Sequence, residues 1–175
     1  MFVRVDFNVP INKESNSIRE DYRIRRALPT IDFLIESGAK IILGSHLGRP
    51  KGTIIQDLSL EIVSNRLSEL INKEVLFCRD FMKDNLSEKV DDMPNGSVIM
   101  LENLRFHKEE TANDKIFSSN LASLAEIYIN EAFGTSHRAH SSTYGMAQGF
   151  KTKIAGFLVS KEIKFISRKK FCSKF

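Results

Sequence analysis

Short apolar runs alternate with segments of helical period, and this alternation limits the folds that the chain can adopt. Five runs rich in Val, Ile and Phe are typical of buried strands, over residues 2–6, 40–45, 75–78, 97–101 and 127–130. Between them, apolar spacings of three and four predict helices, with stripes formed by Ile24, Leu28, Ile31, Leu34 and Ile35, by Leu60, Val63, Leu67 and Leu70, and by Phe117, Leu121 and Leu124. This order predicts an α/β fold, with a parallel sheet and helices on both faces.

Length and charge distribution restrict the class of protein further. A chain of 175 residues suits a single domain, and no apolar run approaches the roughly 20 residues of a membrane span. Residues 161–175 carry six basic side chains and one acidic one, so the net charge of +4 falls to −1 over residues 1–160. Because the basic charge is confined to the tail, a nucleic-acid partner for the domain is disfavoured. Cys78 and Cys172 lie far apart and no signal peptide is visible, which favours a cytoplasmic protein.

Polar and basic residues follow four of the predicted strands, and one more arginine begins the first helix. Ligands of parallel α/β sheets bind outside the carboxyl ends of the strands, so these side chains can face one crevice. Arginine holds phosphate or carboxylate oxygens in a bidentate fork, and glycine lets the backbone approach a ligand. These positions predict a site for a ligand with several anionic groups, formed by Asp6, Asn8, Arg23, His46, Gly48, Arg49, Arg105, Gly134 and Arg138.

Other interpretations of these residues have less support. A lone arginine after a strand is usually a solvated surface group, but four arginines beside Gly, His or Asn weaken that interpretation. His137 and His140 have the spacing of a metal pair, but no third ligand accompanies them and Arg138 lies between them. His107 is expected to be an exposed loop residue. The patterns G-x-G-x-x-G, G-x-x-x-x-G-K-[ST] and G-x-S-x-G do not occur in the sequence, which argues against a nucleotide loop and a serine hydrolase.

Five stretches of the sequence resemble the N-terminal domain of phosphoglycerate kinase, in the family's order and near its spacing. They are RVDFNVP (4–10), RIRRALPTI (23–31), GAKIILGSHLGRPKG (38–52), LENLRFH (101–107) and NEAFGTSHRAHSST (130–143). The resemblance implies a Rossmann-like, three-layer α/β/α sandwich around a mostly parallel six-stranded sheet. It also implies a glycolytic kinase that transfers a phosphoryl group between 1,3-bisphosphoglycerate and Mg-ADP, giving 3-phosphoglycerate and Mg-ATP.

The resemblance further implies a role for each matching residue. Asp6 and Asn8 would contact the glycerate end of the substrate, and Arg23 would be catalytic by stabilising the transferring phosphoryl group. Arg4 and His137 would be supporting members of the basic patch. The non-transferred phosphate would be held by His46, Arg49, Arg105 and Arg138. The full set of implied substrate-binding residues is Asp6, Phe7, Asn8, Arg23, His46, Leu47, Gly48, Arg49, Arg105 and Arg138.

Two departures from the family pattern limit the expected activity. Residues 1–165 match a domain that lacks the family's first segment, and residues 166–175 (ISRKKFCSKF) form a divergent basic tail without a clear amphipathic period. The nucleotide-binding C-terminal domain of the family, which binds Mg-ATP or Mg-ADP, is expected to be absent. The chain is therefore expected to bind phosphoglycerate, to hold no nucleotide, cofactor or metal, and to be catalytically incompetent alone.

Two other functions stay open at this point. A standalone module could bind sugar phosphates or other anions without chemistry, and a nucleic-acid or surface-binding protein could use the basic tail. If the chain is half of an enzyme, activity should return when it is mixed with a separately produced nucleotide-binding domain, whereas an anion-binding module should stay inactive. Deletion of residues 166–175 tests the nucleic-acid or surface-binding function. Phosphoglycerate kinases are usually monomeric, but apolar surface exposed on a fragment could lead to self-association.

Overall fold

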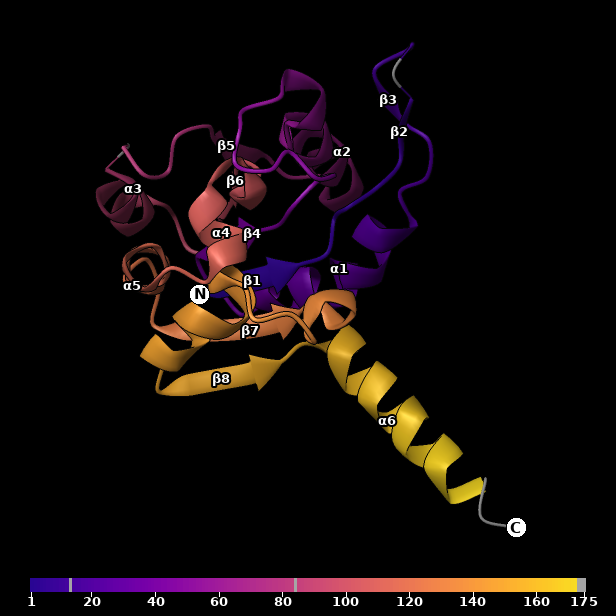
Figure 1. The fold of residues 1–175 in the computed structure, drawn as a ribbon. Coiled ribbons are helices and arrows are strands. Elements are labelled where there is room, and N and C mark those ends of the chain that lie inside the picture. The colour runs from indigo at the N-terminus through magenta and orange to yellow at the C-terminus, as the bar shows by residue number, and fades with distance from the viewer. Residues whose placement is uncertain (13, 84, 173–175) are drawn as a thin grey trace.

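Six strands form one parallel sheet in a computed structural model, which describes residues 1–12, 14–83 and 85–172. Each pair of neighbouring strands is parallel, and Val3 of the central strand lies between Leu43 and Ile129 of its two neighbours. The predicted parallel sheet and the implied six strands are therefore confirmed (Figure 1). The order across the sheet is β5 (Val75–Cys78), β6 (Val98–Leu101), β4 (Ile41–Gly44), β1 (Phe2–Val5), β7 (Ile127–Glu131) and β8 (Thr152–Ala155).

Helices pack on both faces of the sheet and complete three layers. Ile24 and Leu67, from the first two helices, share a hydrophobic cluster with Val3 on one face. Phe117 and Leu121 share a second cluster with Phe2 on the other face, since successive strand residues point to opposite sides. The helices are α1 (Tyr22–Glu36), α2 (Glu61–Ile71), α3 (Leu86–Asp92), α4 (Lys108–Ala112), α5 (Lys115–Ala122) and α6 (Phe157–Cys172). The predicted α/β/α architecture is confirmed.

Short elements connect the main ones and carry the loops at the sheet edge. An antiparallel hairpin joins β2 (Ile11–Asn12) to β3 (Ser17–Ile18). The single-turn helices are η1 (Gln56–Leu58), η2 (Leu104–Phe106), η3 (Phe133–Thr135), η4 (Ser141–Gly145) and η5 (Met146–Gly149). None of the described helices is long and apolar enough to cross a membrane.

The predicted elements differ from the observed ones mainly at their ends and at the sheet margin. The first predicted strand ends one residue earlier, at Val5, and the fifth extends to Glu131. Leu124 lies beyond α5, because that helix ends at Ala122. The residue pattern did not reveal β8, since all four of its residues are exposed at the edge and show no buried face. α6 continues to Cys172, past the boundary predicted at residue 165.

A buried carboxylate anchors the start of α6 beside the sheet. Glu131, the last residue of β7, accepts hydrogen bonds at Oε1 from the Thr30 hydroxyl (2.6 Å) and the Leu158 backbone N–H (3.0 Å). A Cβ at Gly156 would lie 1.8 Å from Glu131 Oε2, so any larger residue there would displace the Glu131 carboxylate. Burial raises the pKa of Glu131. This contact fixes where α6 leaves the domain, and the helix then projects away from the sheet (Figure 1).

Candidate functional site

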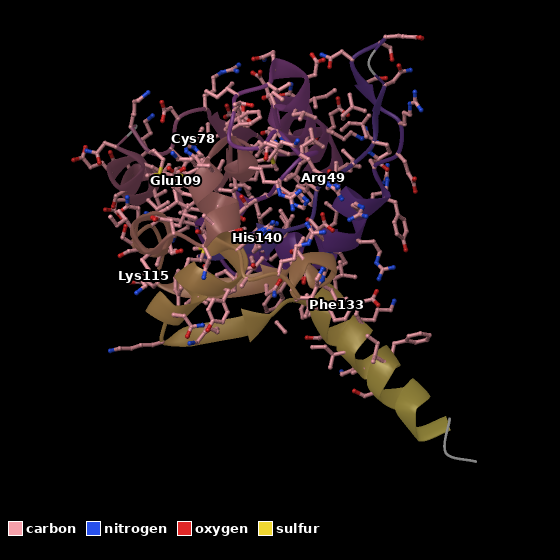
Figure 2. All side chains as sticks on the ribbon, viewed as in Figure 1. Arg49, Cys78, Glu109, Lys115, Phe133 and His140 are labelled. Carbon is pink, nitrogen blue, oxygen red and sulfur yellow. The ribbon has the colours of Figure 1, made fainter. Side chains whose placement is uncertain are left out.

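A pocket of about 250 Å³ lies at the carboxyl ends of four adjacent strands. From β1 the chain continues to the neighbouring strand β4, and β7 is added later along the other edge of β1. β1 therefore lies at a topological switch point, where α/β sheets bind ligands. The segments that follow β1, β4, β6 and β7, with the start of α1, contribute the lining, which consists of Asp6, Asn8, Arg23, His46, Gly48, Arg49, Arg105, Gly134, Thr135 and Arg138. We call this the anion pocket. Figure 2 labels Arg49 on the N-terminal half of the chain, and Phe133 and His140 on the C-terminal half.

The loop after β4 is fixed in place by two side chains of the anion pocket. Asn8 accepts a hydrogen bond at Oδ1 from the Gly48 backbone N–H (2.8 Å), and Arg105 donates from Nη1 to the Gly48 carbonyl (2.9 Å). Gly48 has a φ of +62°, and a Cβ there would lie 2.8 Å from Leu58 Cδ2. The left-handed turn therefore favours glycine at position 48, and a larger residue there would also displace the end of the Leu58 side chain.

Two residues directly after β6 form hydrogen bonds that hold the loop after β4 in place. No role was predicted for them from the sequence. Asn103 donates from Nδ2 to the carbonyls of Leu47 (2.7 Å) and Leu58 (2.9 Å). Glu102 accepts from the Ser59 hydroxyl (2.7 Å) and the Leu60 backbone N–H (2.8 Å). Their position at a strand end was the available signal, but their partners lie more than 40 residues away in the sequence.

The charge of the anion pocket is strongly positive. Its lining includes four arginines, and Asp6 is the single carboxylate within the lining as described. Asp6 forms an ion pair with Arg23. Burial, followed by the nearby guanidinium groups of Arg138 and Arg4, lowers the pKa of Arg105. Arg105 Nε is buried and meets no hydrogen-bond partner among the described residues. Such an arrangement is suited to a ligand with more than one anionic group.

His46 lies against the buried side chain of Arg4 at the base of the anion pocket. Arg4 is fully buried, and its Nη2 is 3.2 Å from His46 Nδ1. Burial, followed by the positive charges of Arg4, Arg105 and Arg138, lowers the pKa of His46 from 6.5 to about 2. His46 is therefore a neutral imidazole at physiological pH and contributes a hydrogen-bonding group without charge.

Acid should destabilise the fold through His46. The folded state keeps His46 neutral to a pKa of about 2, whereas the unfolded chain binds a proton near the ordinary value of 6.5. Between these values the unfolded state holds one more proton, so His46 reduces the free energy of unfolding by about 1.4 kcal/mol for each unit that the pH falls. Urea unfolding at several pH values between about 6 and about 4.5 gives the pH dependence of the free energy of unfolding. The slope of this dependence should be smaller by this amount in His46→Asn, which lacks the titrating group. Equal slopes in the two proteins would contradict the assignment.

Four residues that the resemblance placed in or near the site lie outside the lining. Phe7 and Leu47 point into the hydrophobic core and are 0% and 2% exposed. Arg4 is buried beneath His46, and His137 is exposed beside Arg138, which donates to its Nε2 at 3.4 Å. Thr135, which does line the anion pocket, had no predicted role, although it lies within a strand-end motif.

The histidines that were considered and set aside also have defined positions. The prediction that His107 is an exposed loop residue is wrong, because its ring packs against Phe81 (5.0 Å between centroids) and Phe117 (5.2 Å) and is half-buried. His140 lies 3.9 Å from Glu110, measured between Nδ1 and Oε1. Within the described ranges, no three His, Cys, Asp or Glu side chains gather in a way that could hold a metal ion.

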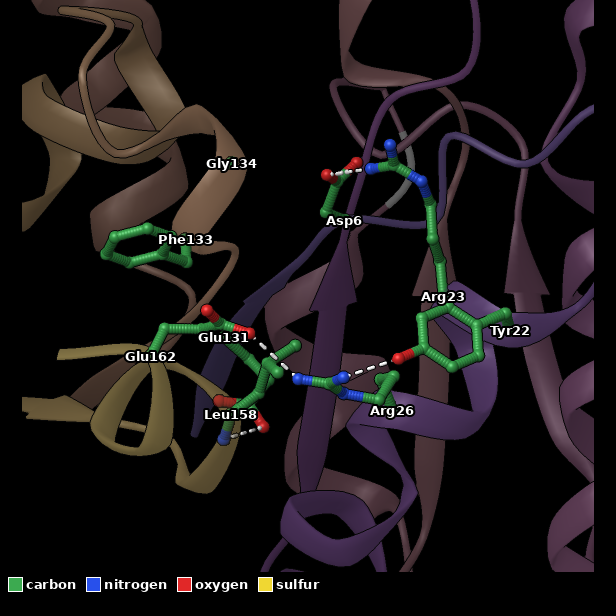
Figure 3. A pocket seen from close by; sticks show the side chains of 9 residues that line it. All are labelled: Asp6, Tyr22, Arg23, Arg26, Glu131, Phe133, Gly134, Leu158 and Glu162. Carbon is green, nitrogen blue, oxygen red and sulfur yellow. Dashed lines mark hydrogen bonds and ion pairs between the residues drawn. The ribbon is translucent and has the colours of Figure 1, made fainter. Parts of the chain in front are cut away.

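A second pocket of about 290 Å³ adjoins the anion pocket and shares Asp6, Arg23 and Gly134 with it. Figure 3 shows this second pocket between α1 and α6, with Arg26 extending from α1 toward Glu162 of α6. Arg26 Nη2 lies 2.9 Å from Glu162 Oε1, so an ion pair joins the two helices at this point. The start of α6 is therefore connected to the helix that carries Arg23.

Comparisons with known proteins agree in family and in fold. The sequence model of the family described as phosphoglycerate kinase matches residues 1–172. The phosphoglycerate kinase of Microcystis aeruginosa is 49% identical over 166 residues, and that of Anaeromyxobacter sp. (strain K) is 51% identical over 170 residues. These alignments cover 95% and 96% of this chain but 41% and 43% of the relatives, so the chain spans about two fifths of their length.

Solved structures give the same result. The structure of phosphoglycerate kinase from Coxiella burnetii is 38% identical to this chain with a TM-score of 0.86, and the match covers 95% of this chain and 41% of the other. The crystal structure of the Pyrococcus horikoshii enzyme is 35% identical with a TM-score of 0.85, and the match covers 95% and 42% of the two chains.

Proposed function

Because the chain belongs to the phosphoglycerate kinase family, we propose that it forms the phosphoglycerate-binding part of such an enzyme. The observation that carries this proposal is the single pocket that four arginines and one carboxylate line at the carboxyl edge of the sheet. Both proposed ligands, 3-phosphoglycerate and 1,3-bisphosphoglycerate, have two acidic ends on a short carbon chain. The reaction would be the glycolytic transfer of a phosphoryl group, in the cytoplasm.

The proposed roles of the arginines differ according to how deeply their side chains are buried. Arg105 lines the anion pocket and is 6% exposed, so it is suited to a phosphate that enters deeply and stays bound. The side chain of Arg23 is 50% exposed at the first turn of α1, where a second reactant could reach it. We therefore assign the non-transferred phosphate to His46, Arg49, Arg105 and Arg138, and the moving phosphoryl group to Arg23.

The remaining polar groups would orient the substrate between these two ends. Asp6 and Asn8 lie in the lining between the switch-point strand and the loop after β4. Asp6 could accept a hydrogen bond from a glycerate hydroxyl, and Asn8 could donate one from Nδ2 to a glycerate oxygen. In phosphoryl transfer the protein mainly positions the reactants and stabilises charge, and fixed guanidinium groups supply both effects. The ion pair between Arg23 and Asp6 holds the arginine at the mouth of the pocket.

The nucleotide would be bound by other residues. The described part of the chain contains no group of three His, Cys, Asp or Glu side chains that could hold a metal ion. We propose that the residues for Mg-ADP and Mg-ATP belong to the part of the relatives that this chain does not span, and that the chain is inactive alone. Because the residues of this one chain form the whole lining of the anion pocket, a second candidate function is an anion-binding module that catalyses no reaction.

Mixing experiments distinguish these two functions. The chain alone should not produce ATP from 1,3-bisphosphoglycerate and Mg-ADP above background. Addition of the separately produced nucleotide-binding part of a relative should restore measurable phosphoryl transfer, because domain closure brings the two half-sites together. Each half assayed by itself is the control. Turnover by this chain alone would contradict the proposed division of the site, and binding of 3-phosphoglycerate without restored turnover would favour the anion-binding module.

A further inference from the structure

A line of buried polar groups extends from the anion pocket into the interior and ends at a carboxylate. Arg4 donates from Nε to the Ser142 hydroxyl oxygen (2.8 Å). The Ser142 hydroxyl donates to Glu110 Oε1 (2.6 Å), and the Ser142 backbone N–H donates to Glu110 Oε2 (2.9 Å). All three residues are 0% exposed. At its other end, Arg4 contacts His46 Nδ1 at 3.2 Å.

The chemistry of these groups fixes the direction of every hydrogen bond in the line. A guanidinium group only donates and an ionised carboxylate only accepts. The Ser142 hydroxyl must therefore accept from Arg4 and donate to Glu110. For the same reason His46 Nδ1 must accept from Arg4, so the proton of the neutral imidazole resides on Nε2.

The buried charges also depend on one another. An isolated guanidinium or carboxylate in the protein interior is strongly unfavourable, whereas a hydrogen-bonded pair offsets much of that cost. Ser142 bridges the positive charge of Arg4 and the negative charge of Glu110, and Tyr128 fixes the bridge further by donating from its hydroxyl to the Ser142 carbonyl (3.0 Å). The Arg4 side chain is therefore held in one orientation toward His46.

We propose that Glu110, acting through Ser142 and Arg4, is a positioning residue that fixes His46 as the Nε2–H tautomer, and that this Nε2–H donates to the ligand's phosphate in the anion pocket. The phosphate part of this inference rests on the proposed function, but the tautomer does not. The charged and titratable groups that act on His46 are Arg4, Arg105, Arg138 and His140. His46 would thus present a fixed, uncharged hydrogen-bond donor among guanidinium groups. Because the ring stays neutral, its hydrogen bond to the ligand would not change with pH near neutrality.

Histidine ¹⁵N spectra of the full chain test the tautomer directly and without a ligand. In the wild type, the His46 resonances should show a protonated Nε2 and an unprotonated Nδ1 across neutral pH. In Ser142→Ala the Arg4 guanidinium loses its Nε partner and keeps the hydrogen bond from Nη1 to the Val5 carbonyl, and in Glu110→Gln the bridge loses its charged end. His46 should therefore show a mixture of tautomers in both variants. Glu109→Gln is the matched control, because it removes a carboxylate from the same helix and leaves the Ser142 bridge intact. Thermal unfolding of each variant verifies that the fold is retained.

A ligand titration extends the test to the anion pocket. Affinity for 3-phosphoglycerate should fall roughly tenfold in Ser142→Ala and in Glu110→Gln, because a hydrogen bond to a charged phosphate is lost for part of the His46 population. The Glu109→Gln control should bind like the wild type. An Nδ1–H tautomer in the wild type would overturn the inference, as would a wild-type tautomer signal in both bridge variants. Because the tautomer is read without ligand, a failure of phosphoglycerate binding would count against the proposed function alone.

Discussion

Replacing Arg23 with alanine should lower phosphoryl transfer by about 10³-fold or more in the mixture of this chain with the nucleotide-binding part of a relative. An arginine directed at the moving phosphoryl group stabilises charge that is largest in the transition state, so its loss reduces turnover more than substrate affinity. Arg23 is placed for this role, because it lies at the mouth of the anion pocket with half of its side chain exposed. The measurement is the steady-state rate at saturating 3-phosphoglycerate and Mg-ATP.

Arg25 provides the matched control for this experiment. It lies two residues along the same helix, pairs with Asp21 at 2.8 Å, and does not line the anion pocket. Arg25→Ala should therefore change turnover little, although it removes the same charge from α1. If the two variants lost activity equally, the effect would come from the general charge of α1, and the assigned role of Arg23 would be wrong.

Removing both Arg49 and Arg138 should weaken 3-phosphoglycerate binding by about 10²-fold or more. Each guanidinium can form charge-assisted hydrogen bonds to the bound phosphate, and loss of one such group typically reduces affinity roughly tenfold to a hundredfold. The two residues come from opposite sides of the anion pocket, after β4 and after β7. Calorimetric titration of the two single variants and the double variant gives the affinities.

The control for surface charge is Arg66→Ala. Arg66 of α2 pairs with Asp21 (2.7 Å), directly before α1, and with Glu69 (2.6 Å), and it does not line the anion pocket. Its loss should leave phosphoglycerate affinity unchanged. Affinity that falls as much in Arg66→Ala as in Arg49→Ala would indicate non-specific attraction of the ligand to a basic protein.

The parts of the fold and site that could be predicted follow from local pattern and one topological rule. Buried strands such as β4 and β6 are continuous apolar runs, and α1 shows its buried stripe in the sequence. Arg49, Arg105 and Arg138 could be placed at one edge, because each follows a strand and parallel strands have their carboxyl ends on the same side. The positions of these residues in the structure agree with that reasoning.

The parts that could not be predicted depend on contacts between distant residues. Arg4 meets Ser142 across 138 positions, and no local pattern indicates that an arginine inside a strand is fully buried. His107 was predicted to be an exposed loop residue, but Phe81 and Phe117 pack against its ring from two other segments. The edge strand β8 has no buried residue, so it lacks the apolar run by which the other strands are recognised.

An NMR titration of the ¹⁵N-labelled chain with 3-phosphoglycerate tests the assigned site most directly. We predict saturable shifts at the backbone amides of Gly48, Gly134 and Thr135 and at Arg105 Nε–H, because these residues line the anion pocket. The same shifts should be much weaker in Arg49→Ala and Arg138→Ala. Saturable shifts confined to other surfaces, shifts unaffected by either substitution, or no saturable shift at any concentration would contradict the assignment of this pocket to phosphoglycerate.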